Sequence, residues 1–453
     1  MAHRVPEYII KLNFNAANSE FPLLGKGVGV RPYGFIIILN LKTANSEFPL
    51  FGSGVGVRPN PMMKSSFIKL IQLLFFTCLF AHLHICASAQ DSSRLRISLL
   101  TCSPGEELYA TFGHSAYRVI DSTSLTDIVY NYGTFNFGED GFYLKFMRGK
   151  LLYYVSTEYF KEFAYGYRSE GRGIIEQVLD LSAAEKVSIR NFLNENLKPE
   201  KRYYKYDFFF DNCTTRLRDI LKKQHDSTFI FRSVMPPGSR FRQAIHEYLD
   251  RNGEVWSKLG IDILLGLPCD AVMTPEQMQF LPDNLMKSLD SGNGSHRLVL
   301  SRQEVCHATV SYQKDPFFTP LVIFSLLLTS IVVLSLVRKR FTHAFLQGFD
   351  GILFFLTGIL GIIVVLMWTV TDHSMCRNNL NLLWAWPTHF IMAFLINSKK
   401  RWVKWYFLIN TTTMAIMLLA WFFLPQQMNN GLLPLVGLLM YRSWVKWWEG
   451  KRV

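Results

Sequence analysis

The chain has 453 residues, of which 49% are hydrophobic and 18% are charged, and its formal net charge is +13. This length allows two or three domains. Much of the basic excess flanks apolar segments, as at 338–340 and 399–401, where positive charge is typical of the cytoplasmic side of a membrane protein. We therefore attribute the charge to membrane topology and do not expect nucleic-acid binding.

The N-terminal residues 1–61 contain an internal repeat, in which residues 17–32 recur at 44–59. Two copies are too few for a solenoid, which needs about three repeats to bury a core. We expect residues 1–61 to be an extension translated from upstream repeat DNA, with the native start at Met62 or Met63.

A secretory signal peptide is expected at residues 62–89. A short basic region opens it at 62–64, an apolar stretch follows at 67–86, and Ala-Ser-Ala at 87–89 supplies the cleavage site. One alternative is a genuine N-terminal domain followed by a transmembrane helix. Another is a lipoprotein signal ending at Cys86, which lacks the small residues expected before such a cysteine.

Residues 90–315 have the composition of an ordinary globular domain, which we expect to be extracytoplasmic. Alternating apolar patterns predict strands, and helical periodicity follows a capping box formed by Ser182 and Glu185. The expected strands are 94–101, 113–120, 127–133 and 203–210, and the expected helices are 182–197 and 216–223.

Cys213 lies at the start of the second expected helix. Asp211 or Asn212 is a natural N-cap there, and a helix N-terminus favours a thiolate and offers N–H groups to an oxyanion. His114, on the second expected strand, is the best-placed base. The alternative for Cys213 is an inert buried thiol, and Cys102, which closes a strand, is a weaker candidate nucleophile.

Five cysteines remain after the expected signal peptide, so at least one thiol is free or forms an intermolecular bond. Cys269 and Cys306 are a candidate disulfide without a recognisable framework. His307 and His343 lack partners at metal-ligand spacing. We expect no metal and no cofactor.

Residues 316–453 are expected to form an all-α transmembrane bundle of about five helices, each needing about 20 apolar residues. The expected spans are 316–337, 351–370, 380–396, 403–424 and 431–444. With the soluble domain outside, the basic residues fall in the loops expected inside. We expect a multi-pass protein of the bacterial inner (cytoplasmic) membrane, with a periplasmic catalytic domain.

Three polar residues, Asp372, His373 and Asn381, lie at the expected external end of this bundle. Polar groups near membrane depth are costly and are therefore candidates for function. They form either a polar loop above an aromatic belt or a headgroup-binding face under the soluble domain.

Several short motifs carry a family resemblance. A strand histidine followed by Asn-Cys at 212–213, opening a helix, resembles the circularly permuted papain-like enzymes, such as lecithin–retinol acyltransferases and permuted NlpC-type peptidases. More specifically, the order and spacing of the motifs resemble the Lnb-type lipoprotein N-acyltransferase family, from about residue 94 to the C-terminus. These motifs lie at 99–105, 112–119, 130–135, 211–216, 280–283, 371–373 and 379–384.

The resemblance implies an α+β, permuted papain-like domain and a membrane-bound thiol acyltransferase. Cys213 would attack a phospholipid acyl donor to form a thioester, and His114 would manage the proton. A diacylated lipoprotein would then accept the acyl chain on its N-terminal amine. Asn131 is the first candidate to orient His114, and Tyr132, on the other strand face, is a poorer one.

The sequence leaves alternatives open for the roles of the binding residues and for the overall function. Arg118 is a candidate for gripping a phosphate or a structural ion pair, and Asn212 is an oxyanion-site candidate or a simple cap. Asp372, His373 and Asn381 are the candidate substrate-binding residues of the membrane part. A cell-wall amidase or peptidase of the papain-like class and a non-catalytic envelope assembly or sensor protein remain as other functions.

Overall fold

The computed structural model describes residues 93–224, 231–292, 297–310, 317–337 and 339–449. The expected N-terminal extension at 1–61 lies outside the described residues, as does the expected signal peptide at 62–89. All described residues belong to one compact unit.

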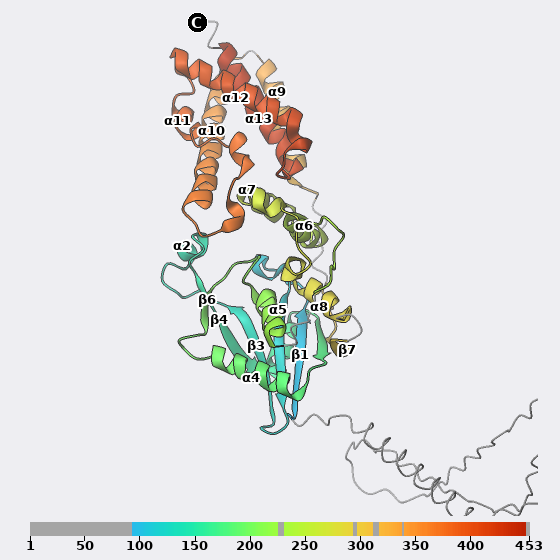
Figure 1. The fold of residues 1–453 in the computed structure, drawn as a ribbon. Helices are drawn as coiled ribbons and strands as arrows, with labels where there is room; N and C mark the ends of the chain where they lie inside the picture. Colours follow the sequence, from blue (N-terminus) through green and yellow to red (C-terminus); the bar gives the residue numbers. More distant parts are fainter. Residues whose placement is uncertain (1–92, 225–230, 293–296, 311–316, 338, 450–453) are drawn as a thin grey trace, which may run out of the picture. The chain divides into compact units, whose positions relative to one another are not determined.

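A seven-stranded antiparallel sheet in the order β6-β4-β3-β2-β1-β5-β7 is the framework of the N-terminal described part (Figure 1). Together with its helices it confirms the α+β class. The strands are β1 (Leu95–Cys102), β2 (His114–Asp121), β3 (Thr126–Thr134), β4 (Leu152–Tyr159), β5 (Ile174–Leu179), β6 (Tyr203–Lys205) and β7 (Val299–Cys306).

The first three strands confirm the sequence-based expectation to within one or two residues. The fourth expected strand, 203–210, is wrong beyond residue 205, where β6 ends. Asp207 there accepts hydrogen bonds from the N–H groups of Phe209 and Phe210, at 2.8 and 3.1 Å. Aspartate favours such local turns over strand pairing, so the aromatic run leaves the sheet and packs in a separate core.

Helices cover both faces of the sheet. The expected helix at 182–197 is confirmed as α4, and its capping box between Ser182 and Glu185 is present. The helices of this part are α2 (Phe142–Met147), α3 (Phe160–Ser169), α4 (Ala183–Asn196), α5 (Cys213–Gln224), α6 (Phe241–Arg251), α7 (Val255–Leu264) and α8 (Pro282–Asp290).

Alternate residues of β1 belong to two separate hydrophobic cores, because successive side chains of a strand point to opposite faces of the sheet. Ile97 and Leu99 pack with residues of α4, α5 and α8 on one face. Leu100 and Cys102 pack with residues of α3 on the other. Figure 1 shows α4 and α5 in front of the same strands. The central strands β1 and β2 are thus largely buried between helices on the two faces of the sheet.

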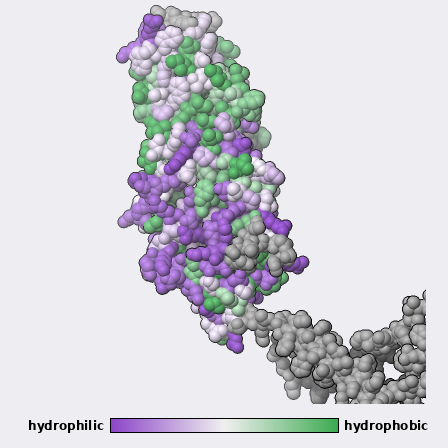
Figure 2. All heavy atoms as spheres, viewed as in Figure 1, coloured by the Kyte–Doolittle hydropathy of each residue, from purple (hydrophilic) through white to green (hydrophobic). Residues whose placement is uncertain are grey.

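The C-terminal part is helical and strongly apolar, and Figure 2 shows hydrophobic residues gathered over it. Two helices, α10 and α12 with its extension to Phe423, are long and apolar enough to cross a membrane, and α9 is a shorter apolar helix. The helices are α9 (Pro320–Leu336), α10 (Arg340–Thr369), α11 (His389–Phe394), α12 (Arg401–Ala420) and α13 (Leu433–Glu449).

The expected span at 380–396 is not a continuous helix. A 3-10 turn at Leu380–Leu383 and the short α11 are separated by an irregular stretch that contains Pro387. Proline removes a backbone donor and interrupts a helix. Backbone packs directly on α10 here, since a Cβ at Gly358 or Gly361 would overlap backbone atoms of residues 385–390. The number of membrane crossings stays a prediction.

One buried ion cluster ties three of these helices together. Asp350 of α10 accepts hydrogen bonds from Arg442 of α13 at 2.6 and 2.8 Å, and Lys446 lies 3.0 Å from it. Arg442 also donates to Ser335 of α9. Charges inside a membrane domain are costly unless paired, and here each carboxylate oxygen has a partner.

Candidate active site

The expected nucleophile and base meet at one end of the sheet. Cys102, the last residue of β1, pairs with His114, the first residue of β2, so both side chains lie where these strands end. Gly133 lies near the end of β3 with φ +90°, and a Cβ placed on it would lie 3.6 Å from Cys213 Cβ. The start of α5 therefore lies directly beside the end of β3.

Asn212 fixes the start of α5. Its Oδ1 accepts from the N–H of Thr215 at 2.8 Å, which is the N-cap interaction. Its Nδ2 donates to the carbonyls of Phe208 at 2.7 Å and Phe280 at 2.8 Å. The backbone on both sides is thereby held, and Cys213 becomes the first residue of the helix.

His114 lies beside Asn131, the residue that the sequence suggested for orienting it. Its Nε2 lies 3.2 Å from Asn131 Oδ1, and Asn131 Nδ2 donates to Glu158 Oε1 at 2.8 Å. Because the carboxylate of Glu158 can only accept, it fixes the amide so that its oxygen faces the imidazole. Nε2 therefore carries the proton, and Nδ1 is left for the thiol of Cys213.

Electrostatic interactions between Cys213 and His114 favour the thiolate–imidazolium ion pair. Burial raises the pKa of the Cys213 thiol, but the charge and hydrogen bond of His114 and the N–H of Ser115 outweigh it and lower the pKa to about 7. Burial opposes protonation of His114, yet its interactions with Cys213 and Asn131 raise the pKa of His114 above its usual value. A thiolate is therefore available near neutral pH, which is what a nucleophilic cysteine requires.

The start of α5 also offers hydrogen-bond donors to a developing negative charge. The first N–H groups of a helix have no partner within the helix. Asn212 accepts a hydrogen bond from the N–H of Thr215. The N–H groups of Cys213 and Thr214 come before Thr215 in the helix. Donors beside the nucleophile are the arrangement that stabilises an oxyanion.

Cys102, the rival nucleophile, has opposite properties. It is 1% exposed, and burial raises the pKa of its thiol to about 12, against a lowering by Tyr167 and Arg172. Such a thiol stays protonated at neutral pH. The candidate disulfide is wrong: Cys269 and Cys306 are both free and belong to different cores.

Three of the expected binding residues have their polar groups engaged within the protein. Arg118 donates to Asp127 at 2.7 and 2.8 Å and to Glu176 at 2.8 Å. Asn212 is the helix cap, and Asn381 is 1% exposed and donates to the carbonyls of Asp262 and Ile263. A role in substrate binding for Arg118, Asn212 and Asn381 stays a prediction, and it would require some of these bonds to break.

Asp372 and His373 are placed differently, because they contact the part that carries the sheet. Asp372 Oδ2 lies 3.2 Å from Lys205 Nζ, and the N–H of Asp372 donates to Arg148 at 3.0 Å. His373 Nε2 lies 3.2 Å from the carbonyl oxygen of Phe146. Their side chains remain accessible to a ligand.

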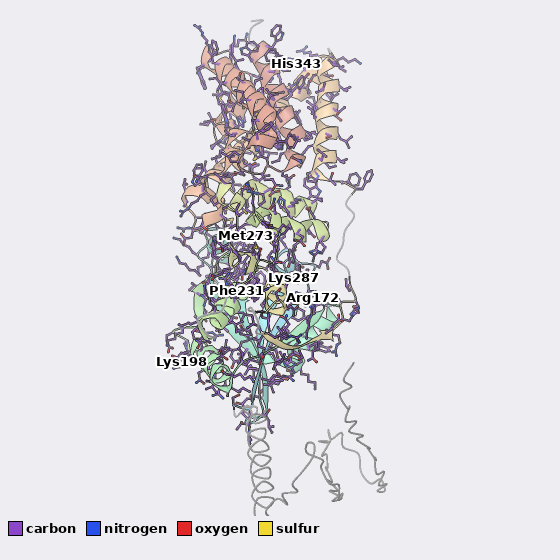
Figure 3. All side chains as sticks on the ribbon, turned by 45° about the vertical axis from the view of Figure 1, so that its right-hand side comes forward. Arg172, Lys198, Phe231, Met273, Lys287 and His343 are labelled. Carbon is purple, nitrogen blue, oxygen red and sulfur yellow. The ribbon has the colours of Figure 1, made fainter. Side chains whose placement is uncertain are left out.

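Three side chains near the thiol were not predicted from the sequence. Glu158 lies on β4, whose pairing with β3 nothing in the sequence marks. Tyr206 has a ring atom 3.8 Å from where a Cβ on Gly133 would lie. The positive charge of Arg172, a residue labelled in Figure 3, opposes protonation of His114, although the pKa of His114 is raised overall. Nothing in the sequence distinguishes Tyr206 from the rest of the 19 tyrosines.

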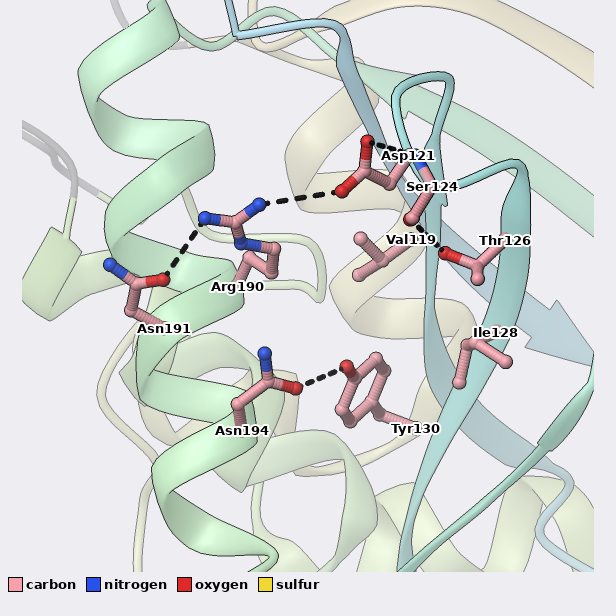
Figure 4. Close-up of a pocket in the computed structure, with 9 residues that line it drawn as sticks. All are labelled: Val119, Asp121, Ser124, Thr126, Ile128, Tyr130, Arg190, Asn191 and Asn194. Carbon is pink, nitrogen blue, oxygen red and sulfur yellow. Dashed lines mark hydrogen bonds and ion pairs between the residues drawn. The ribbon is translucent and has the colours of Figure 1, made fainter.

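A pocket of about 280 Å³ lies at the opposite end of the sheet, away from Cys213. Figure 4 shows it between α4 and the turn joining β2 to β3, with Arg190 bonded to Asp121 and Tyr130 bonded to Asn194. Asp121 is the last residue of β2 and His114 the first, so about 23 Å of strand separates the two places. This pocket is no part of the candidate active site.

Two family models match the chain, one in each half. Residues 84–250 match the family model for the Lnb N-terminal periplasmic domain, and residues 312–452 match the one for the Lnb transmembrane domain. Neither the curated proteins nor the solved structures give a significant match. Since both parts of one family occur in order, the chain belongs to the Lnb-type lipoprotein N-acyltransferase family of lipoprotein-modifying membrane enzymes, with a periplasmic and a transmembrane domain.

Proposed function

We propose that the protein is a membrane-bound thiol acyltransferase that moves an acyl chain from a phospholipid to the N-terminal diacylglyceryl-cysteine of lipoproteins. The observation that supports this most is the thiol of Cys213 at the start of α5, beside His114 held by Asn131. Nucleophile, base and orienting group are the parts that covalent acyl transfer needs.

In the first half-reaction the thiolate of Cys213 attacks the carbonyl carbon of a phospholipid ester. The tetrahedral oxyanion is stabilised by the N–H groups of Cys213 and Thr214. When the C–O bond breaks, the imidazolium of His114 gives its proton to the departing alkoxide, and a lysophospholipid leaves. The acyl chain remains on Cys213 as a thioester.

In the second half-reaction the α-amine of the lipoprotein cysteine attacks the thioester carbonyl. His114 accepts the proton of the amine, the C–S bond breaks, and the thiolate of Cys213 is restored. The product carries the third acyl chain as an amide. Asn131 keeps the ring of His114 in position for both transfers.

The rest of the chain fits substrates that stay in a bilayer. We assign the sheet and the helix opened by Cys213 to a permuted papain-like domain, and the C-terminal part to about five crossings of the inner membrane. Anchoring the domain at the membrane surface raises the effective concentration of lipid donor and acceptor. Asp372 and His373 are the proposed headgroup contacts.

Complementation tests this function. A strain that lacks lipoprotein N-acylation receives wild type, Cys213→Ala or the matched control Cys306→Ala, which removes another free thiol of the same sheet. Mass spectrometry of the lipoprotein N-terminus should show the third chain with wild type and the control only.

Two other results would contradict the proposal. Restoration by Cys213→Ala would indicate a non-catalytic assembly factor. Absence of the third chain with correctly inserted wild type, together with release of cell-wall peptides, would indicate an amidase.

A further inference from the structure

An exposed apolar surface surrounds α2, on the same side of the sheet as the strand ends that carry the candidate active site. We call it the α2 lip. Large apolar side chains that remain exposed to solvent in groups mark protein or membrane contacts. The lip consists of Tyr109, Phe137, Tyr143, Leu144, Phe146 and Met147, which are 65%, 60%, 76%, 57%, 51% and 54% exposed.

Hydrogen bonds hold the lip to the end of a membrane helix. α10 ends at Thr369, and Asp372, three residues later, donates its N–H to the carbonyl of Arg148, directly after α2. His373 contacts the carbonyl of Phe146 inside α2. A Cβ on Gly149 would lie 3.2 Å from Asp372 Cβ, so the two segments are in close contact. The lip therefore lies at the level where α10 leaves the bilayer.

The charges beside the lip match a phospholipid surface. Arg148 and Lys150 are exposed next to these apolar side chains, and Lys205 is exposed and paired with Asp372. Interfacial segments combine aromatic and aliphatic residues that enter the headgroup region with basic residues that meet phosphate. Both kinds of residue are present within a few positions of α2.

A continuous row of aromatic rings leads from the lip towards the thiol. Ring centroids of Phe137 and Phe135 are 4.8 Å apart, and those of Phe135 and Tyr153 are 5.2 Å apart. Tyr153 stacks on Tyr206 at 4.3 Å. Tyr206 then lies beside Gly133, where the start of α5 brings Cys213.

We propose that the α2 lip inserts into the outer leaflet and that a phospholipid acyl chain leaves the bilayer there and follows the row of aromatic rings to Cys213. This rests on the proposed function for the role of Cys213, but the insertion itself does not. The bilayer, and not a protein, is the occupant, because the lip is bonded to residues that follow a membrane helix by three positions.

Photo-crosslinking in nanodiscs tests the insertion without any chemistry at Cys213. A benzophenone amino acid replaces Leu144 in the full-length protein, and its matched control replaces Leu125. Leu125 is 91% exposed in the turn between β2 and β3, at the other end of the sheet. After irradiation, mass spectrometry should find phospholipid adducts at position 144 and none at 125. No adduct at 144, or equal adducts at both positions, overturns the insertion.

Turnover tests the acyl path. Leu144→Asp should lower transfer from bilayer phospholipid about tenfold, since an apolar contact with the bilayer is lost. Leu125→Asp should leave it unchanged. Turnover of a water-soluble short-chain ester should be the same in both variants.

The two proposals fail differently. If wild type transfers no acyl chain yet crosslinks at position 144, the function is wrong and the insertion stands. If Leu144→Asp lowers turnover of the soluble ester as much as that of phospholipid, the lip supports the catalytic end structurally and the acyl path is wrong.

Discussion

The surroundings of two histidines in the same part of the chain differ: buried His246 lies in an ion cluster, and half-buried His114 lies beside a thiol. His246 of α6 lies 2.8 Å from Asp262, and Asp262 also accepts a hydrogen bond from Arg242 at 2.8 Å. Arg242 is completely buried and bonds Asp270 as well. His114, in contrast, has the neutral amide of Asn131 on one side and a thiol on the other.

The difference lies in how the charge is compensated. At Asp262, burial raises the pKa of the carboxyl, but His246 and Arg242 outweigh it and lower the pKa. Asp262 and Arg242 are thus fixed opposite partners in the buried cluster. At Cys213 the charge depends on one proton that can move between thiol and imidazole. A saturated ion cluster holds segments together, while a group with one mobile proton can react.

The cluster around Arg242 also joins the two parts of the chain. Asn429, in the loop before α13, donates to Asp262 at 2.8 Å, and the N–H of Gln427 donates to Asp270 at 3.2 Å. Both carboxylates thus bind loops of the transmembrane domain. We therefore expect substitutions here to affect stability and substitutions at Cys213 to affect turnover.

The largest effect is expected for Cys213→Ala. Acyl transfer should fall by about 10⁴-fold or more, because the nucleophile of a covalent route is removed. Thermal stability in detergent should stay close to that of wild type, since Cys213 is only partly buried. Residual transfer near the wild-type rate, measured as N-acylated lipopeptide over time, would remove Cys213 from the mechanism.

Arg242→Met should be the most destabilising change, by about 3–5 kcal/mol, because it leaves two buried carboxylates with too few partners. Arg251→Met is the matched control. Its side chain is 50% exposed and pairs with Glu247 and Asp283, which are 54% and 27% exposed, and each pair should contribute less than about 1 kcal/mol. Thermal unfolding in detergent compares the two. Equal unfolding temperatures would show that the buried cluster is not what holds the segments together.

Asn131→Ala should lower kcat by about 10- to 100-fold with little change in KM, since a small misplacement of His114 is enough. Asn191→Ala, on the exposed side of α4, is the control and should behave as wild type. A change in KM alone, from steady-state rates at several lipid concentrations, would argue for substrate contact by Asn131 instead of positioning.

The smallest effect is a shift in pH dependence. The thiolate is the reactive form, so alkylation of Cys213 by iodoacetamide should accelerate as pH rises through about 7. In His114→Gln the midpoint should move upward by about one unit or more, because the cation that favours the thiolate is gone. Cys102, whose pKa is raised to about 12, should stay unlabelled over this range. An unchanged midpoint in His114→Gln would show that His114 does not favour the thiolate of Cys213.

Local patterns sufficed for much of this molecule. The strands that became β1, β2 and β3, the capping box of α4, and Cys213 at the start of a helix all follow from residues close together in sequence. Such features depend on alternation, capping and helix periodicity, which act over a few residues. The strand pattern also placed His114 and Asn131 on the strands that carry them, while their catalytic roles stay predictions.

Contacts between distant residues required the tertiary structure. The sequence did not mark Glu158 behind Asn131 or the break in the expected span at 380–396. It left open whether Arg118 grips a phosphate or forms the ion pairs that the structure shows. It also gave no sign that Asp372 binds Arg148 beside α2. These features depend on strand pairing and on which segments pack together, and the free energy of such packing is a property of the whole fold.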